Sequence, residues 1–430
     1  MIGGSGFCFQ SKGVMNKVLF ISSMVISSLA ISAVAQTPHK GVFRIYEPGY
    51  FQNTILKGVE NFESKKDAGK QKPTFRLDPA GLQIPADKSL FTTAWHIEPV
   101  SQGNTNTCWS FSAISMLESE IYRLTRQEIK LSEMFIAYHE YLERARLFVE
   151  SRGEIYIGEG SEMNAVIRVM NKEGILPWSA YSGLKPGQEF HSHDKMFEEV
   201  RAYLNGVKAA NAWDKETVVA TVKSILDHYI GTPPETVTIN GKAYSPRQYL
   251  KEVVRINPAD YVDVLSIMQQ PYWRQVEFEV PDNWWHDRSY YNVPLDDFMK
   301  VLKKALKQGY TVSLAGDVSE AGFMAREANA AMVPEFDIPS VAIDENARQF
   351  RFSNGTTTDD HGMHVTGFYE KDGATWFLLK DSGAGSRTGG PENNRNFGYY
   401  FFHEDYVKLK MMTFLVHRDA IKDLLPKFSR

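Results

Sequence analysis

The chain has 430 residues, a formal net charge of −4 at pH 7 and 43% hydrophobic residues. This composition is typical of globular domains and excludes a disordered or collagen-like chain, while the length allows two or three domains, or one fold with a large insertion. Because there is no excess of basic residues, neither nucleic acid nor an anionic membrane surface is expected as a partner.

The first 35 residues have the pattern of a cleavable secretory signal. Lys12 and Lys17 precede an apolar run from Val18 to Ile31, and Ala33-Val34-Ala35 follows it. Such a signal consists of a basic start, a short apolar stretch and an A-x-A site, and this run is too short for a comfortable membrane span. We therefore expect residues 1–35 to be removed and the protein to be exported to the periplasm or the extracellular space, without stable membrane insertion. An uncleaved N-terminal anchor is the alternative.

Four regions are expected after the signal. They are a polar lead-in (36–92), a helical domain (93–185), a helical insertion (186–292) and a β-rich domain (293–425). Apolar periodicity predicts helical segments at Cys108 to Leu147, Asn164–Lys172, Met196–Leu204, Lys215–Tyr229, Pro246–Val254 and Pro294–Gln308. Short aromatic or β-branched runs predict strands at Tyr310–Ala315, His364–Tyr369, Trp376–Lys380, Tyr399–His403 and Lys410–Val416. A cleft between a helical half and a sheet half is the natural place for a site.

Cys108 is the only cysteine left once the signal is removed, because Cys8 lies within it. Exported proteins usually carry cysteines in pairs, so a single thiol needs an explanation. A polar loop ends at Cys108, where the strongest predicted helix begins, and the positive end of a helix favours a thiolate nucleophile. Trp109 would pack the first turn, and Gln102, six positions upstream, could donate to an oxyanion near the sulfur. A buried, inert cysteine is the alternative.

His361 has the best context for a general base. It lies in a turn that enters a predicted strand, in the segment Asp359-Asp360-His361-Gly362-Met363-His364. Strand alternation places His361 and His364 on opposite faces, so only one of them can face a site. An H-x-x-H metal pair is the alternative, but that spacing suits a helix, and we expect neither a metal nor another cofactor. The polar segment His191-Ser192-His193 is expected to be solvated.

Asp381 follows the predicted strand Trp376–Lys380 and could accept a hydrogen bond from His361 across the hairpin. This bond would fix the imidazole tautomer and complete a Cys–His–Asp arrangement. An aspartate at such a position, taken alone, is more often a turn residue.

Taken together, these residues resemble the papain-like cysteine peptidases, in particular the branch that contains bleomycin hydrolase and bacterial aminopeptidase C. The motifs that carry the resemblance are Gln102 with Cys108-Trp109-Ser110-Phe111, Leu131-Ser132-Glu133-Met134, Asp360-His361 with Gly367, and Tyr291-Asn292-Val293-Pro294. The resemblance implies an α+β, papain-like two-domain fold with a helical left domain, a β-sheet right domain and a helical insertion. It also implies that Cys108, His361, Asp381 and Gln102 are catalytic, that Gly160, Ser161 and Trp109 bind substrate, and that the C-terminal tail closes one end of the groove.

The chain departs from this family in three places. Asp381-Ser382-Gly383 stands where the family has Asn-Ser-Trp, Gly160-Ser161 stands for a glycine pair, and the export signal contrasts with the cytosolic location of this branch. An aspartate can still orient an imidazole, so we expect activity with an altered pH profile.

The signal pattern predicts export, and the resemblance predicts a cysteine peptidase acting on peptides, with aminopeptidase action favoured over endopeptidase action. A catalytically silent papain-fold binding protein is one alternative, and a metal-dependent hydrolase using Asp359, His361 and His364 is another. Assembly into a homo-oligomer is left open.

Overall fold

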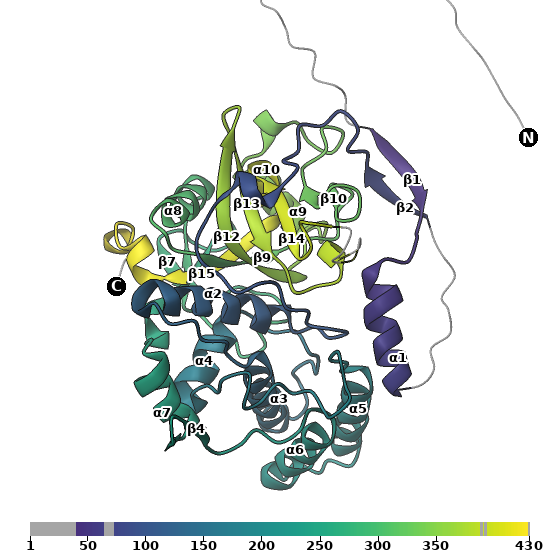
Figure 1. Ribbon diagram of the computed structural model, residues 1–430, viewed down its shortest axis with the longest axis vertical. Helices are drawn as coiled ribbons and strands as arrows, with labels where there is room; N and C mark the ends of the chain where they lie inside the picture. Colours follow the sequence, from purple (N-terminus) through teal and green to yellow (C-terminus); the bar gives the residue numbers. More distant parts are fainter. Residues whose placement is uncertain (1–39, 64–72, 388–389, 391–393, 429–430) are drawn as a thin grey trace, which may run out of the picture. The chain divides into compact units, whose positions relative to one another are not determined.

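The computed structural model describes residues 40–63, 73–387, 390 and 394–428 (Figure 1). Contacts between residues divide the chain into residues 1–37 and residues 38–430, and everything described below belongs to the second part. The expected secretory signal, residues 1–35, and Cys8 within it lie outside the described residues.

The helices of one half of this part gather below the sheet in the view of Figure 1. They are α2 (Cys108–Thr125), α3 (Glu133–Glu150), α4 (Asn164–Glu173), α5 (Asp194–Ala209) and α6 (Lys215–Ile230). The helical stretch expected from Cys108 to Leu147 is divided into α2 and α3. Arg126 takes a left-handed conformation (φ 62°) that ends α2, and the Ser132 side chain caps α3 by accepting a hydrogen bond from the backbone N–H of Phe135.

The other half is built on one sheet that has eleven strands within the described residues. The strand order is β10-β11-β14-β13-β12-β9-β15-β6-β8-β7, and β3 pairs with β12 beside this path. The bounds are β3 (Thr92–Thr93), β6 (Tyr261–Leu265), β7 (Arg274–Val276), β8 (Tyr290–Asn292), β9 (Val312–Gly316), β10 (Phe323–Met324), β11 (Ala330–Ala331), β12 (His361–Lys371), β13 (Ala374–Lys380), β14 (Tyr399–His403) and β15 (Met411–His417). Neighbouring strands are antiparallel except for the parallel pairs β11–β14 and β6–β8.

The two halves meet where α2 lies against β12 and β9. Met363 and Val365 of β12 belong to the apolar core that also contains α8 (Leu295–Lys307), on the face away from α2. The intervening His364 bonds to a residue of α2. Because side chains alternate along a strand, β12 contributes one row of residues to each half.

Shorter elements complete the described chain. They are β1 (Gly41–Ile45) paired with β2 (Pro73–Leu77), a π-helical turn (Phe51–Leu56) running into α1 (Lys57–Glu63), β4 (Val237–Ile239) paired with β5 (Lys242–Tyr244), α7 (Pro246–Gln248) with the π-helical turn Tyr249–Val254, α9 (Glu345–Ser353) and α10 (Glu404–Lys410). No helix among the described residues is both long enough and apolar enough to span a bilayer.

The region 186–292 differs from the helical insertion expected from the sequence. Its first part contains α5, α6 and α7, but its second part supplies β6, β7 and β8 to the main sheet. These strands are only three to five residues long. They join the rest of the sheet through the pairing of β6 with β15, which lies far along the chain, so short runs between Pro- and Trp-rich loops gave no local signal for this sheet.

Candidate active site

The seven site residues expected from the sequence come together at the boundary between the two halves. Gln102, Cys108, Trp109, Gly160, Ser161 and His361 all line one cavity of about 260 Å³. Asp381 lies behind His361, to which it is hydrogen-bonded. The cavity thus combines residues from the loop before α2, from the segment before α4 and from the start of β12.

Cys108 is the first residue of α2, and its side chain is partly exposed. At the first position of a helix the backbone N–H has no acceptor within the helix, and the helix dipole favours negative charge there. The neighbouring Trp109 is buried and donates from its indole Nε1 to the carbonyl of Glu159 at 3.1 Å. This bond holds the start of α2 against the segment that carries Gly160.

Gln102 is held in one orientation by two hydrogen bonds. Its Nε2 atom donates to the carbonyl of Thr105 at 2.6 Å, and its Oε1 atom accepts from the hydroxyl of Ser382 at 2.7 Å. An amide nitrogen has two N–H groups, so the second remains available on the cavity side. Ser382 directly follows Asp381, so the loop that orients the imidazole also orients the amide.

His361 and Asp381 form a buried ion pair, with His361 Nε2 2.7 Å from Asp381 Oδ1. Burial lowers the pKa of His361, but Asp381 and Cys108 outweigh it by charge and hydrogen bonding, so the pKa is raised well above its usual value. Burial raises the pKa of Asp381, but His361 and Arg387 lower it to about 2 overall. Since Nε2 is bonded to Asp381, Nδ1 is the ring nitrogen left to face Cys108.

His364 lies on the face of β12 opposite His361, as strand alternation predicts. It is fully buried, and its Nδ1 atom is 2.8 Å from the hydroxyl of Ser115 on α2. Burial and the nearby charges of Lys380 and His96 hold its pKa well below the usual value. Two histidines on opposite faces cannot share one ion, so the H-x-x-H metal pair is not formed. The described residues contain no group of three or more His, Cys, Asp or Glu placed to hold a metal ion.

Arg387 lies next to Asp381 and holds the loop that carries it. Its side chain is 1% exposed, and its guanidinium donates to the carbonyls of Asp381 (2.7 Å), Gly383 (2.7 Å) and Val100 (3.2 Å). The hydroxyl of Ser386 donates to Oδ2 of Asp381 at 3.1 Å. The sequence analysis missed Arg387, because an arginine in a Gly- and Ser-rich loop has no pattern that marks it as buried.

Gly383 lets this loop pass close to the ion pair. A Cβ atom there would lie 3.2 Å from Asp381 Oδ2 and 3.2 Å from His361 Cε1. This chain has Gly383 at the position where the family has a Trp. The loop backbone, rather than an indole ring, therefore lies against the imidazole of His361.

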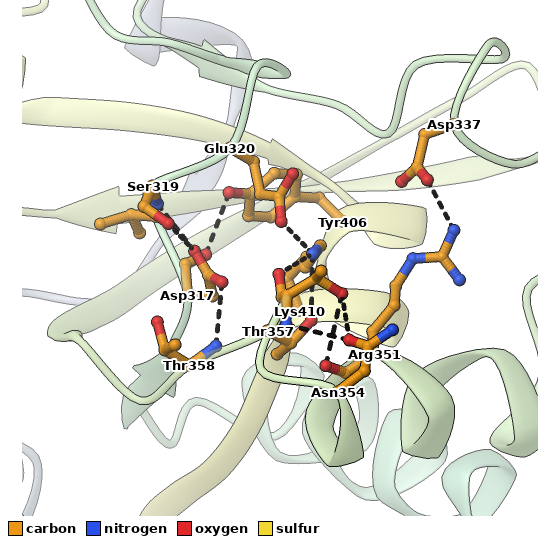
Figure 2. Close-up of polar contacts among 12 residues, drawn as sticks. Asp317, Ser319, Glu320, Asp337, Arg351, Asn354, Thr357, Thr358, Tyr406 and Lys410 are labelled. Carbon is orange, nitrogen blue, oxygen red and sulfur yellow. Dashed lines mark hydrogen bonds and ion pairs between the residues drawn. The ribbon is translucent and has the colours of Figure 1, made fainter.

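The segment before His361 is held by two side chains that lie far away in the sequence (Figure 2). Lys410 is buried and donates to the carbonyl of Thr356 (2.9 Å), the hydroxyl of Thr357 (3.0 Å) and the carboxylate of Glu320. Asp317 accepts from the backbone N–H of Thr358 at 2.9 Å. These bonds fix the backbone that leads into β12, and so fix the place where His361 begins the strand.

The side chains of Arg144 and Glu140 hold the Gly160-Ser161 segment in place. The Arg144 guanidinium donates to the carbonyls of Gly158 and Gly160, and the Ser161 hydroxyl donates to Glu140 at 2.6 Å. A Cβ atom on Gly160 would lie 2.2 Å from the carboxylate of Asp282, so any larger residue at that position would require the Asp282 side chain to move. The hydroxymethyl group of Ser161 is directed toward buried Glu140.

The expectation that His191-Ser192-His193 is solvated is wrong. All three residues are buried. The backbone of this segment pairs with Asn104, and the His193 Nδ1 atom lies 3.5 Å from the carboxylate of Glu159. Burial, with His193 nearby, lowers the pKa of His191 to about 3. The segment supports the loop before Cys108, which its polar composition did not suggest.

Five carboxylates also line the cavity: Glu159, Glu162, Asp282, Asp359 and Asp360. The sequence analysis considered Asp359 only as a metal ligand, named Asp360 only as the neighbour of His361, and missed Glu159, Glu162 and Asp282. Glu162 directly follows Gly160-Ser161 in the sequence. Its place next to these two expected substrate-binding residues was the signal that could have identified it as a site residue.

Comparisons with known proteins assign the chain to a peptidase family. The model of the Peptidase C1-like family matches residues 158–425, a stretch that includes His361 and Asp381 but begins after Cys108. Aminopeptidase C of Lactobacillus delbrueckii subsp. lactis is 20% identical over 311 residues, which are 63% of this chain and 65% of that enzyme. Aminopeptidase C of Streptococcus thermophilus is 22% identical over 323 residues, which are 63% of this chain and 70% of that enzyme.

The crystal structure of PepW from Lactobacillus rhamnosis HN001 superposes with a TM-score of 0.61 at 17% identity, covering 79% of this chain and 84% of that one. At this identity the likeness concerns the fold, and it agrees with the α+β, two-part architecture. The match to the first curated relative spans just under two thirds of that enzyme's length.

Proposed function

The chain belongs to the Peptidase C1-like family of papain-like cysteine peptidases, and we propose that it hydrolyses peptide bonds with Cys108 as the nucleophile. The observation that carries the proposal is the ordered set of contacts from Asp381 through His361 to Cys108, at the first residue of a helix and beside the oriented amide of Gln102.

Each group has one task in the first half of the reaction. The Cys108 thiolate attacks the carbonyl carbon of the peptide bond, and the backbone N–H of Cys108 and the free N–H of Gln102 stabilise the oxyanion. The His361 imidazolium donates its proton to the leaving amine as the C–N bond breaks. The raised pKa of His361 supports this task, because it keeps the ring protonated until that step.

The second half restores the thiol site. A water molecule attacks the thioester carbon while His361 takes its proton, the C–S bond breaks, and the carboxylic acid leaves. Asp381 holds the ring through Nε2 during both halves, so Nδ1 stays directed at the reacting atoms.

The protein removes residues from the amino terminus of peptides in this proposal. The support is the name of two curated relatives, both aminopeptidase C. The proposal also includes export directed by residues 1–35, supported by Lys12 and Lys17, the apolar run and Ala33-Val34-Ala35. Sequencing the amino terminus of the protein recovered outside the cytoplasm tests the export: it should begin after Ala35, and an intact signal on cytoplasmic protein would contradict it.

Mass spectrometry of the products from a defined peptide mixture tests the activity. The unchanged protein should release amino-terminal residues, whereas Cys108→Ala should release none and unfold at the same temperature. Cleavage at internal bonds would replace the aminopeptidase part of the proposal. Full hydrolysis by Cys108→Ala would overturn the whole of it.

A further inference from the structure

A loop of the sheet half reaches the Cys108 cavity and contacts its opposite wall. The loop joins β7 to β8 (residues 277–289), and Asp282 within it lines the cavity. A Cβ atom built on Gly160 would lie 2.2 Å from one oxygen of the Asp282 carboxylate and 2.6 Å from the other. The carboxylate therefore lies directly against the backbone of Gly160, which belongs to the helical half, and two walls of the cavity meet there.

Trp284 anchors this loop on the helical half. The residue is 4% exposed, and its indole Nε1 atom donates to Glu140 Oε1 at 2.9 Å and to the hydroxyl of Ser161 at 3.3 Å. The guanidinium groups of Arg144 and Arg168 lie 4.9 Å and 5.2 Å from the centre of its ring, which is the geometry of a cation–π contact. The loop is therefore fixed to α3 and α4, across the boundary between the two halves.

Asn283 fixes the shape of the loop from within. It is buried, its Nδ2 atom donates to the carbonyls of Phe278 (2.9 Å) and Asp287 (3.1 Å), and its Oδ1 atom accepts from the backbone N–H of Asp287 at 2.9 Å. A buried side chain with all of these bonds satisfied makes the surrounding backbone rigid. Because Asp282 directly precedes Asn283, its carboxylate is held at Gly160.

The position of this contact determines which part of a substrate it limits. In the proposed mechanism His361 gives its proton to the leaving amine, so the chain on the carboxyl side of the cleaved bond departs beside His361. The chain on the amino side stays on Cys108 as the acyl group and extends along the Gly160-Ser161 segment, which is expected to bind substrate. A contact that closes the cavity at Gly160 therefore limits the amino side of the substrate.

The C-terminal tail, which was expected to close one end of the groove, lies elsewhere in the described residues. Phe428 contacts the rings of Trp273 and Tyr291, with centroids 5.5 Å and 4.8 Å apart, and Lys427 pairs with Asp297. None of residues 424–428 lines the cavity. The described chain thus closes the cavity with an internal loop and not with this part of the tail.

We propose that the β7–β8 loop, through Asp282 and its anchor Trp284, forms a barrier that admits only a short amino-terminal portion of the substrate and so makes the protein an exopeptidase. The inference rests on the proposed peptidase function and names residues that set its specificity. The cavity of about 260 Å³ is smaller than the ~300–1,000 Å³ of pockets that enclose a drug-sized ligand, so it suits a chain end. A peptide that continues further on the amino side meets the loop, and the clash excludes it.

Two substrates measure the barrier. The first is the fluorogenic amide of the single amino acid that the protein releases best from the peptide mixture. The second is an internally quenched decapeptide that carries the same residue at its centre and an acetylated amino terminus, so that only internal bonds can be cleaved. For the unchanged protein, kcat/KM for the amide should exceed that for the decapeptide by about 100-fold or more.

Variants of the loop should open the groove. Asp282→Gly and, independently, Trp284→Ala should raise the ratio of decapeptide to amide cleavage about 10-fold or more, because one removes the barrier and the other its anchor. Having two variants keeps the test valid if thermal unfolding shows that one fails to fold. Asp282→Asn is the matched control, since it keeps the shape of the side chain and removes only the charge, and the ratio should stay low.

Trp178→Ala provides a second control. It is the same chemical change as Trp284→Ala, at an exposed residue that does not line the cavity, and it should also leave the ratio low. A rise in this variant that equals the rise in Trp284→Ala would overturn the barrier, because the effect would then not depend on the loop.

Decapeptide cleavage by the unchanged protein at the same kcat/KM as the amide would overturn the barrier and leave the peptidase proposal intact. An unaltered ratio in either folded loop variant would do the same. So would an equal rise in Asp282→Asn and Asp282→Gly, which would assign the selectivity to charge. If the peptide mixture yields no products at all, the proposed function itself is overturned, and this inference with it.

Discussion

The two sides of the candidate site are built in different ways. The nucleophile side combines local and distant contacts: Cys108 begins α2 and Gln102 bonds to Thr105 three residues away, while Glu159 accepts from Trp109 and Ser382 donates to Gln102. The base side depends on distant residues, because Asp317, Lys410 and Arg387 hold the segments that carry His361 and Asp381. The position of the thiol thus follows from the start of one helix, whereas the imidazole and its partner carboxylate lie on segments held only by residues from other elements.

The largest expected effect separates the two histidines of β12. His361→Ala should reduce kcat by ~10²–10⁴-fold, since this is the usual contribution of general acid–base catalysis. His364→Ala should keep most of the turnover and lose stability, because the His364 side chain is hydrogen-bonded to Ser115 of α2 and does not line the cavity. Steady-state kinetics and thermal unfolding of both variants measure this. The reverse outcome would mean that His364, and not His361, lies on the face of β12 that carries the catalytic base.

The next effect concerns the carboxylate behind His361. Asp381→Ala should cost about 10²-fold in kcat, because an imidazole without its acceptor is free to leave the reactive geometry. Asp381→Asn should keep activity but move the alkaline limb of kcat/KM to lower pH. The sign follows because Asp381 helps to raise the pKa of His361, and a neutral amide removes that part of the rise. If kcat/KM of Asp381→Ala equals that of the unchanged protein at every pH, Asp381 is only a turn residue and does not orient His361.

Arg387 tests whether the bracing of the base side acts on the chemistry. Arg387→Met should lower kcat about 10-fold with little change in KM, and move the alkaline limb in the same direction as Asp381→Asn. The reason is that the loop carrying Asp381 loses its donors to three carbonyls. Arg387→Lys keeps the charge but not the planar fork, and should recover only part of the loss. Lower stability with an unchanged pH profile would make Arg387 purely structural.

Lys410 should have the smallest effect on turnover. Lys410→Met leaves the carbonyl of Thr356 and the Glu320 carboxylate without their donor, which should cost about 1–3 kcal/mol in the free energy of unfolding. We expect kcat/KM to fall by less than about 10-fold, since Asp317 still holds Thr358. Urea unfolding measures the first value, and Lys422→Met, at an exposed position, is the control. A larger fall in kcat/KM would mean that Lys410 alone sets the position of His361.

The difference between the two sides also explains what the sequence could predict. Helix periodicity placed Cys108 at the start of a helix, and strand alternation placed His361 and His364 on opposite faces of a strand, because these signals are local. The choice of His361 over His364 came from the family resemblance. They could not reveal Arg387 or Lys410, whose partners become neighbours only in the folded chain. Polar residues are normally solvated, and this general rule failed for His191–His193 because backbone pairing with Asn104 buries them.

The same reasoning applies to the fold. The strands β9, β12, β13, β14 and β15 were anticipated within a few residues of their bounds, because each has an aromatic or β-branched run. The strands β6, β7 and β8 were missed, since their runs are short and their pairing is distant. The contact of Asp282 with Gly160 was missed for the same reason, because the two residues are far apart in sequence.

The protonation state of His361 tests the account most directly. We propose that Asp381 and Cys108 together keep this ring as an imidazolium in the resting protein, with a pKa well above the usual value. The nitrogen chemical shifts of the His361 ring, followed by NMR from pH 5 to 9, measure it. We expect both ring nitrogens to stay protonated at pH 7, and the transition to move to lower pH in Cys108→Ala and in Asp381→Asn. A neutral His361 at pH 7 in the unchanged protein would contradict the account.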